Sequence, residues 1–239
     1  MESQRAAQAL AQASASLTTS YDAVGALAAL LENCRHGLDV DAGGILVETG
    51  GQLELLASSS HEMAELEAYQ LQVDEGPCVD AFQKGTAVQE HTIESLTERW
   101  PQFAATMVAA GFESVHATPL QIQGRTFGAM GIFRRDPLAF TPDEDVVARG
   151  FAHIASMLVL QLGEVPPEQL YRRLQNALDA RVLLEQAKGV LAGAHDLSMA
   201  EAYDLLVQSA RDRHQPLTAW AVQVIASAQT PREQQARQE

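Results

Sequence analysis

A stretch of helical periodicity from Leu170 to Ala192 constrains the organisation of this chain most strongly. Its apolar positions recur every three to four residues, as on one face of an α-helix, and the cationic Arg181 and Lys188 stand in the same stripe. Pro166 and Pro167 come just before it, and prolines end an incoming helix but are tolerated in the first turn of a new one. We therefore expect one domain over residues 1–163 and a helical unit over residues 164–228, followed by a disordered polar tail over residues 229–239.

The composition excludes several classes of protein. The chain has 239 residues, enough for two domains. It has no apolar run of about 18 residues that could cross a membrane, and its start lacks the basic and apolar regions of a secretory signal. Its two cysteines, Cys34 and Cys78, cannot build a disulfide framework. These features predict a cytoplasmic protein without a membrane partner.

The net charge of −15 is unevenly distributed along the chain. Residues 1–165 hold 8 Lys and Arg against 22 Asp and Glu, whereas residues 166–239 hold 8 against 9. The acidity therefore belongs to the first part and does not exclude nucleic-acid binding by the second. Taken alone, the cations of the second part favour an ordinary solvated helix face, in which Glu185 pairs with Arg181 or Lys188.

Residues 5–36 have the pattern of one long helix. Apolar residues recur in it at seven-residue steps, as in a helix that packs on its own domain and equally in a parallel coiled-coil seam. The four positions are Leu10, Leu17, Val24 and Leu31. Both interpretations stay open; the second, together with Val147 and Ile154 of a later helix, predicts a homodimer.

Strand and helix patterns alternate over the rest of the first domain. A hairpin is expected from Ala42–Glu48 and Leu53–Ser58 around the turn Thr49-Gly50-Gly51-Gln52. Further strands are expected at 87–93, 115–122 and 126–133, and helices at 61–72, 100–110 and 141–162. In the last of these, Thr141 is a plausible N-cap and Glu144 completes a capping box. The order predicts an α+β sheet domain with helices packed on the sheet.

Short matches in a fixed order connect this domain to a known family. They are Glu75-Gly76-Pro77-Cys78, Asp80-Ala81, Arg99-Trp100-Pro101, Phe103, Gly111-Phe112, Ser114-Val115, Pro119-Leu120, Gly128-Ala129 and Phe140-Thr141. Together they resemble the GAF domain, a sensor fold, in the subgroup found upstream of ANTAR modules. The resemblance covers nearly all of residues 20–162 and implies a sensor for an unidentified small ligand or a protein signal.

Three residues could line a ligand pocket in this sensor domain: Cys78, His91 and His116. Partly buried structural roles are the alternative for all three. They lack the spacing of metal ligands, so no metal and no cofactor are predicted. The chain has no P-loop, GxSxG or HExxH motif, so no enzymatic activity is predicted.

The second unit is expected to form three helices. The first is Leu170–Ala192, a loop follows over Gly193–Leu197, the second begins at the capping box Ser198–Glu201, and the third begins near Thr218. The residues that carry a resemblance are Ala177-Leu178, Arg181, Gln186-Ala187-Lys188-Gly189, Leu191, Glu201-Ala202-Tyr203 and Leu205-Leu206. They resemble the all-α ANTAR domain, an RNA-binding antiterminator module. Ala180 departs from the family, in which a small polar residue precedes the arginine.

The resemblance implies an RNA-binding surface that recognises paired hairpins in an mRNA leader. Its expected residues are Arg173, Arg181, Gln186, Ala187, Lys188, Gly189, Tyr203 and Arg211. Cations would contact phosphates, and unpaired loop bases would meet Arg or Gln side chains such as Gln186 or stack on Tyr203. The alternative role for Tyr203 is a place in the core. Gly189 would allow close approach of the RNA backbone or, alternatively, of the next helix.

Two functional hypotheses follow. The first is an antitermination regulator in which a GAF-like sensor controls an ANTAR module that binds RNA. The second is a ligand-sensing or protein-binding module whose helical tail serves dimerisation and partner docking, with Arg181 and Lys188 merely paired to acids.

Overall fold

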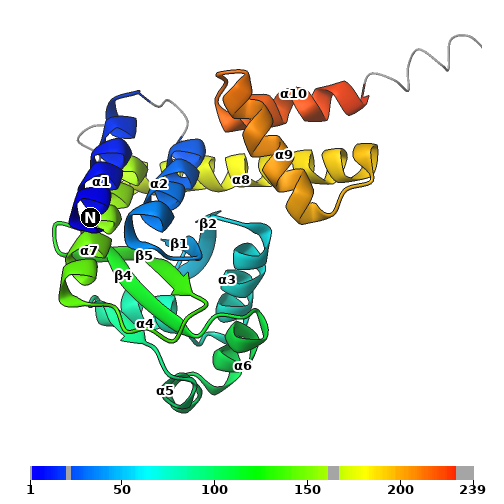
Figure 1. The fold of residues 1–239 in the computed structure, drawn as a ribbon. Helices are drawn as coiled ribbons and strands as arrows, with labels where there is room; N and C mark the ends of the chain where they lie inside the picture. The colour runs from blue at the N-terminus through cyan, green and yellow to red at the C-terminus, as the bar shows by residue number, and fades with distance from the viewer. Residues whose placement is uncertain (1, 20–22, 161–166, 230–239) are drawn as a thin grey trace, which may run out of the picture.

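The computed structural model describes residues 2–19, 23–160 and 167–229, with side chains over 4–17, 24–160 and 178–228. Its centre is one antiparallel sheet of five strands in the order β2-β1-β5-β4-β3 (Figure 1). The strands are β1 (Ala42–Thr49), β2 (Gln52–Ser58), β3 (Val88–Glu90), β4 (Ser114–Ile122) and β5 (Arg125–Arg134). The described helices are α1 (Glu2–Thr19), α2 (Ala23–Leu38), α3 (His61–Val73), α4 (Pro77–Lys84), α5 (Ile93–Arg99), α6 (Pro101–Ala109), α7 (Pro142–Leu160), α8 (Pro167–His195), α9 (Met199–Asp212) and α10 (Leu217–Gln229).

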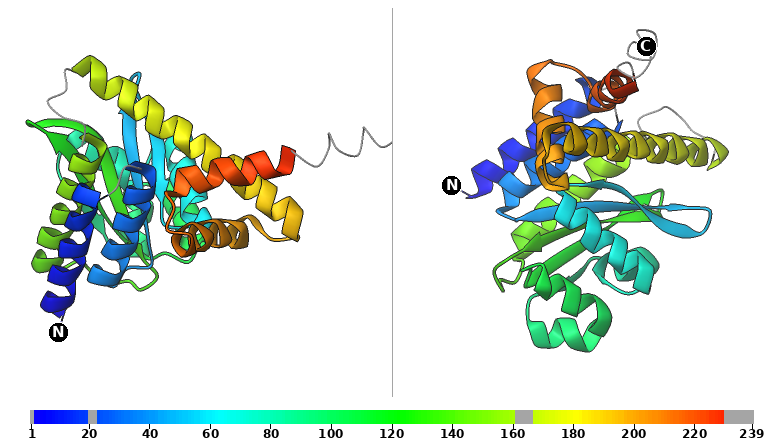
Figure 2. Two further views of the ribbon diagram at one scale, coloured as in Figure 1. Left: turned by 90° about the horizontal axis from the view of Figure 1, so that it is seen from above. Right: turned by 90° about the vertical axis from the view of Figure 1, so that its right-hand side faces the viewer.

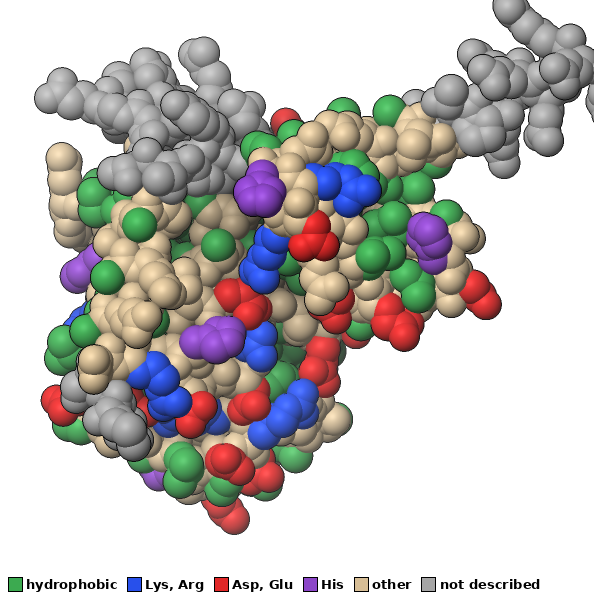
Figure 3. Space-filling model, turned by 45° about the horizontal axis from the view of Figure 1, so that its top comes forward, with side chains coloured by type: hydrophobic (Ala, Val, Ile, Leu, Met, Phe, Trp, Pro, Cys, Tyr) green, Lys and Arg blue, Asp and Glu red, His purple; other side chains and the backbone are tan. Residues whose placement is uncertain are grey.

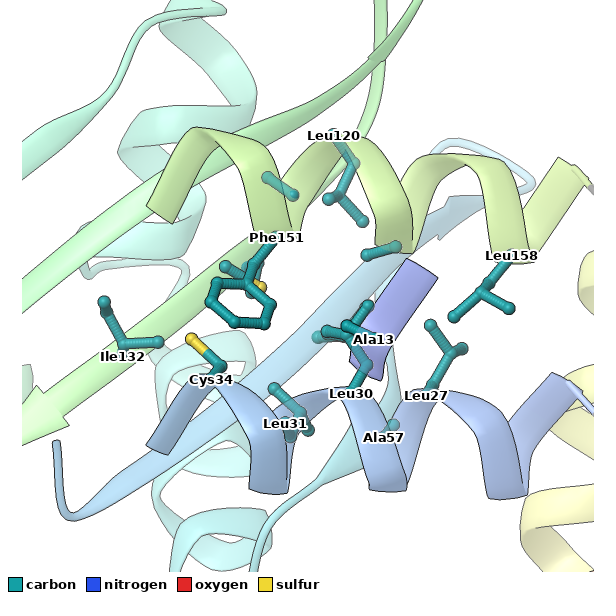
Figure 4. Packing of buried hydrophobic residues seen from close by; sticks show 14 of the residues in the cluster. Ala13, Leu27, Leu30, Leu31, Cys34, Ala57, Leu120, Ile132, Phe151 and Leu158 are labelled. Carbon is teal, nitrogen blue, oxygen red and sulfur yellow. The ribbon is translucent and has the colours of Figure 1, made fainter. Parts of the chain in front are cut away.

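Helices α1, α2 and α7 cover one face of the sheet. Their buried side chains point toward one another and toward the sheet, as Figure 4 shows for Leu27, Leu30, Phe151 and Leu158. Burial of these aliphatic and aromatic groups is the main favourable term for this layer, at about 2 kcal/mol for each fully buried side chain.

Helices α3 to α6 cover the opposite face. The second core cluster lies there, around Trp100, Phe103, Phe112 and Phe133. The sheet thus has both faces buried, so β4 and β5 are buried along most of their length instead of alternating between core and solvent. This is the predicted α+β sheet domain with helices packed on the sheet.

The last three helices form a separate unit beside β2 and α2, which Figure 2 shows in two views. They share an apolar cluster that includes Leu184, Ala187, Leu206 and Ala221. We call helices α8 to α10 the helical module. Val24 of α2 belongs to the same cluster, and Leu178 of α8 belongs to the core of the sheet domain, so each unit places an apolar side chain in the core of the other.

The predicted single helix over residues 5–36 is wrong. Two helices, α1 and α2, occupy this range and pack on each other and on α7. The four seven-residue positions are buried or partly buried within the chain, so burial in the chain's own core explains their periodicity. Val147 and Ile154 also pack against that core.

Two smaller predictions also need correction. The strand expected over 87–93 is present but shorter, as β3 (Val88–Glu90), and the unpredicted helix α5 begins after Thr92, whose hydroxyl accepts a hydrogen bond from the Ser95 amide. The helix α8 continues through Gly193 to His195, into the predicted loop, and Asp196 follows it with a positive φ of 53°. Residues 161–166, which contain the predicted domain boundary, and residues 230–239 lie outside the described residues.

None of the described helices has the length and apolar character needed to span a membrane.

Candidate functional site

Lys188 lies inside the molecule, between the helical module and the sheet domain. Its side chain is 2 % exposed, and its Nζ donates to Oε2 of Glu185 at 2.9 Å. The same Nζ lies 3.4 Å from Nδ1 of His61, the first residue of α3. The position follows from the sequence, because Lys188 belongs to the apolar stripe of α8 and that stripe faces the core. A buried ammonium requires such a partner.

Tyr203 of α9 lies beside Lys188, with the ammonium 5.6 Å from the ring centroid. Its hydroxyl donates to the backbone carbonyl of Ser58 at 3.1 Å. Burial, together with the nearby carboxylates of Glu32, Asp204 and Glu185, raises the pKa of the Tyr203 phenol to about 12. Tyr203 is therefore a neutral hydrogen-bond donor to the end of β2.

Arg181 lies near Lys188 and Tyr203, two turns before Lys188 in α8. It lines a narrow space of about 30 Å³ together with Tyr203, Glu185, Ser58 and Ala28 of α2. We call the surface formed by Arg181, Lys188 and Tyr203 the docked face. It unites three of the residues predicted to bind RNA, and it is turned toward the sheet domain.

The other predicted RNA-binding residues are distributed differently. Gln186, Gly189 and Arg211 are exposed, and Ala187 is fully buried in the core of the module. No atom of another segment lies within 4 Å of the position that a Cβ on Gly189 would occupy, so packing against a neighbouring helix does not explain this glycine. The side chain of Arg173 lies outside the described residues.

Cations and acids are intermixed where the two units meet. On the face drawn in Figure 3, blue Lys and Arg side chains alternate with red Asp and Glu side chains, and the described residues of this face form no continuous basic patch. Arg213 lies over the ring of Trp220, with 4.2 Å between its Cζ and the ring centroid.

The three predicted pocket residues of the sheet domain do not come together. Cys78 of α4 is buried in the cluster under α3 to α6. His116 of β4 points to the other face, where its Nε2 lies 2.9 Å from Oδ1 of Asp145 in α7. His91 is exposed after β3. Burial lowers the pKa of His116 in spite of its Asp145 partner, so this imidazole is mostly neutral at pH 7.

A buried polar cluster, which the sequence analysis missed, lies around Cys78. The carboxyl of Glu67 in α3 accepts a hydrogen bond from Gln70 and lies 3.8 Å from the Cys78 sulfur. Burial raises the pKa of Glu67 to about 8, although its hydrogen bonds oppose the shift, and burial raises the pKa of the Cys78 thiol well above its usual value. Both groups are therefore protonated at neutral pH.

Two strand glycines make room for this cluster. A Cβ on Gly44 would lie 2.5 Å from Oε1 of Glu67, and one on Gly131 would lie 2.7 Å from Sγ of Cys78. Glycine inside a strand marks close approach of another group, so Gly44 in β1 was the signal that could have revealed it. Among the described residues, no group of three or more His, Cys, Asp or Glu could hold a metal ion.

Several motif residues of the sheet domain tie its loops together. The carboxylate of Glu75 accepts hydrogen bonds from the amides of Gln102 and Phe103, in the first turn of α6. The guanidinium of Arg99 pairs with both Asp80 and Glu90. These contacts give the motif a structural role.

The architecture has two parts, a five-stranded sheet domain followed by a three-helix module. The family model of the GAF domain matches residues 22–159, and that of the ANTAR domain matches residues 172–225. The chain belongs to the GAF-ANTAR family. In this family, the GAF domain is a sensor domain and the ANTAR domain is an RNA-binding antitermination module.

Solved structures resemble the sheet domain in fold. The GAF domain of a phosphoenolpyruvate-protein phosphotransferase from Coxiella burnetii is 15% identical, with a TM-score of 0.53 over 66% of this chain and 94% of that chain. The GAF domain of nlh2 from A. aeolicus in an inactive state is 16% identical, with a TM-score of 0.52 over 69% of this chain and 100% of that chain. No curated protein matches the chain.

Proposed function

We propose that this protein is an RNA-binding regulator of transcription antitermination. Its GAF domain senses a small molecule or a protein signal, and its ANTAR module binds paired hairpins in the leader of a nascent mRNA in the cytoplasm. Binding favours an antiterminator over a terminator. The observation that carries the proposal is the ANTAR match over residues 172–225 together with the shared surface of Arg181, Lys188 and Tyr203.

Each proposed contact has a chemical reason. Arg181, Lys188, Arg173 and Arg211 supply positive charge for phosphates. Gln186 carries the amide groups that hydrogen-bond base edges, and Tyr203 offers a ring on which an unpaired base stacks. Gly189 has no side chain, so the surface of α8 at this position is open to close approach of the RNA backbone.

The test is a titration of the full chain with a leader RNA from its own genome that contains two short-looped hairpins. Arg181→Ala combined with Lys188→Ala should lower the affinity about tenfold or more and flatten its salt dependence, because two phosphate contacts are lost. The control is Arg5→Ala combined with Arg125→Ala, which removes the same charge at exposed sites of the first domain. Circular dichroism verifies the fold, since Lys188 is buried.

Unchanged affinity in the Arg181/Lys188 variant would contradict the proposal, and so would the absence of RNA binding both by the wild-type chain and by a variant whose helical module is separated from the sheet domain. The second candidate is a sensor whose helical tail serves dimerisation and partner docking. One observation favours it: Lys188 is paired with Glu185 and packed on the sensor domain. Under that alternative the wild-type chain does not bind the hairpin RNA at any salt concentration.

A further inference from the structure

We propose that the GAF domain inhibits the ANTAR module by covering its docked face, so that RNA and the GAF domain compete for Arg181, Lys188 and Tyr203. The proposal rests on the proposed function and adds the way in which that function is regulated. The signal would then act by releasing the module from the sensor domain.

The two polar contacts across the interface occupy the groups that RNA would need. The Lys188 ammonium is neutralised by Glu185 and lies against His61, so it cannot reach a phosphate from this position. The Tyr203 hydroxyl is bonded to the Ser58 carbonyl. Both partners in the GAF domain come from one short segment, residues 58–61, which joins β2 to α3. A change in this segment would alter both contacts together.

The apolar part of the interface has the character of a contact that can separate. Among the described buried residues, Val24 alone enters the module's core from the GAF domain, and Leu178 alone enters the GAF core from the module. Beside them lies the unfilled space of about 30 Å³ that Arg181 and Ala28 line. Interfaces between domains of one chain are more polar than obligate ones, and relative motion is expected unless the interface is large and hydrophobic.

The α3 helix connects this interface with the buried polar cluster of the GAF domain. His61 lies at its first residue, and Glu67 and Gln70, which contact Cys78, lie further along the same helix. A shift of α3 would therefore move the contact to Lys188 as well. A structural change around Cys78 can therefore reach the docked face through α3.

The experiment uses the full chain and a substitution outside the RNA-binding residues. Ala28→Trp places an indole at a space of about 30 Å³, which is too small to hold it. The substitution should therefore separate the helical module from the GAF domain. The affinity for the two-hairpin RNA should rise about tenfold, because a binding-competent state that is rarely populated weakens the apparent affinity in proportion. Ala28→Ser, which adds one atom, is the matched control and should bind as the wild type does.

Hydrogen–deuterium exchange of the wild-type chain supplies a second measurement. RNA should increase the exchange of peptides that cover residues 52–73, since the end of β2 and the start of α3 lose their cover. Equal affinities for wild type and Ala28→Trp, with unchanged exchange, would overturn the competition and leave RNA binding intact. If neither the wild-type chain nor Ala28→Trp binds the RNA, both proposals fail. If Ala28→Trp does not fold, the exchange measurement decides alone.

Discussion

At the scale of single residues, several polar groups of the described chain are buried or partly buried. Lys188, Tyr203 and Glu67 are each held by a partner from another part of the fold, as buried polar groups require. The periodicity of α8 predicted that Lys188 lies in the apolar stripe, and the structure buries it there. Its partner His61 is 127 positions away in the sequence, so local pattern could not identify it.

The buried carboxyl of Glu67 predicts a specific dependence of stability on pH. Between pH 4.5 and about 8 the folded chain keeps a proton that the unfolded chain releases. The free energy of unfolding should therefore fall as the pH rises through this window, by roughly 1 kcal/mol per pH unit from this group, and should level off above it. Glu67→Gln removes the titration. Urea denaturation at several pH values measures the difference between variant and wild type.

The control for this prediction is Glu65→Gln, at an exposed position of the same helix. It should keep the wild-type pH dependence. If Glu67→Gln and wild type change in parallel between pH 4.5 and 8, Glu67 is ionised in the folded protein and the prediction is wrong.

At the scale of elements, caps and turns were predictable because their signals are local. The capping box Ser198–Glu201 is present, with the Ser198 hydroxyl accepting from the Glu201 amide and the Glu201 carboxylate accepting from the Ser198 amide. Gly50 and Gly51 adopt the positive φ that the predicted hairpin turn needs. The end of α8 was missed because Gly193 is a common helix stop, yet nothing here interrupts the helix before Asp196.

Substitution of two glycines of α8 can distinguish an effect on stability from an effect on RNA binding. Gly189 and Gly193 both stand in the helix with no atom of another segment within 4 Å of their missing Cβ. Alanine at either position should raise the free energy of unfolding by up to about 1 kcal/mol, because glycine weakens a helix interior. We predict that Gly189→Ala also weakens RNA binding, since its Cβ would obstruct the RNA backbone, whereas Gly193→Ala leaves the affinity unchanged.

Thermal denaturation and RNA titration of the two variants test this pair of predictions. Equal RNA affinities in Gly189→Ala, Gly193→Ala and wild type would show that close backbone approach at Gly189 is not part of binding. A loss of stability in either variant would mean that α8 packs more tightly at that point than the structure shows.

At the scale of the whole molecule, the homodimer remains a prediction, but different residues now support it. The seven-residue positions of α1 and α2 are used inside the chain, so they cannot form the predicted seam. The α7 helix instead exposes Val146 at 58% and Met157 at 55%, and the two stand eleven positions apart, which puts them close to one helix face.

We predict that Val146→Asp combined with Met157→Asp shifts a dimer to monomer at micromolar concentration, because charges would be buried in the interface. Light scattering measures the mass of both proteins. Val182→Asp, at an exposed apolar position of α8, is the control and should leave the mass unchanged. A wild-type monomer at this concentration would contradict the dimer for the free protein.

The sequence by itself determined the two-part organisation, the α+β class of the first part and most element positions. These depend on periodicity, caps and short motifs, all of which act over a few residues. Only the tertiary structure decided that Arg181, Lys188 and Tyr203 face the GAF domain, that Cys78 and His116 lie on opposite faces of the sheet, and that Glu67 meets Cys78. The reason is physical: burial of an ionisable or polar group depends on partners far away in sequence, and local pattern contains no record of them.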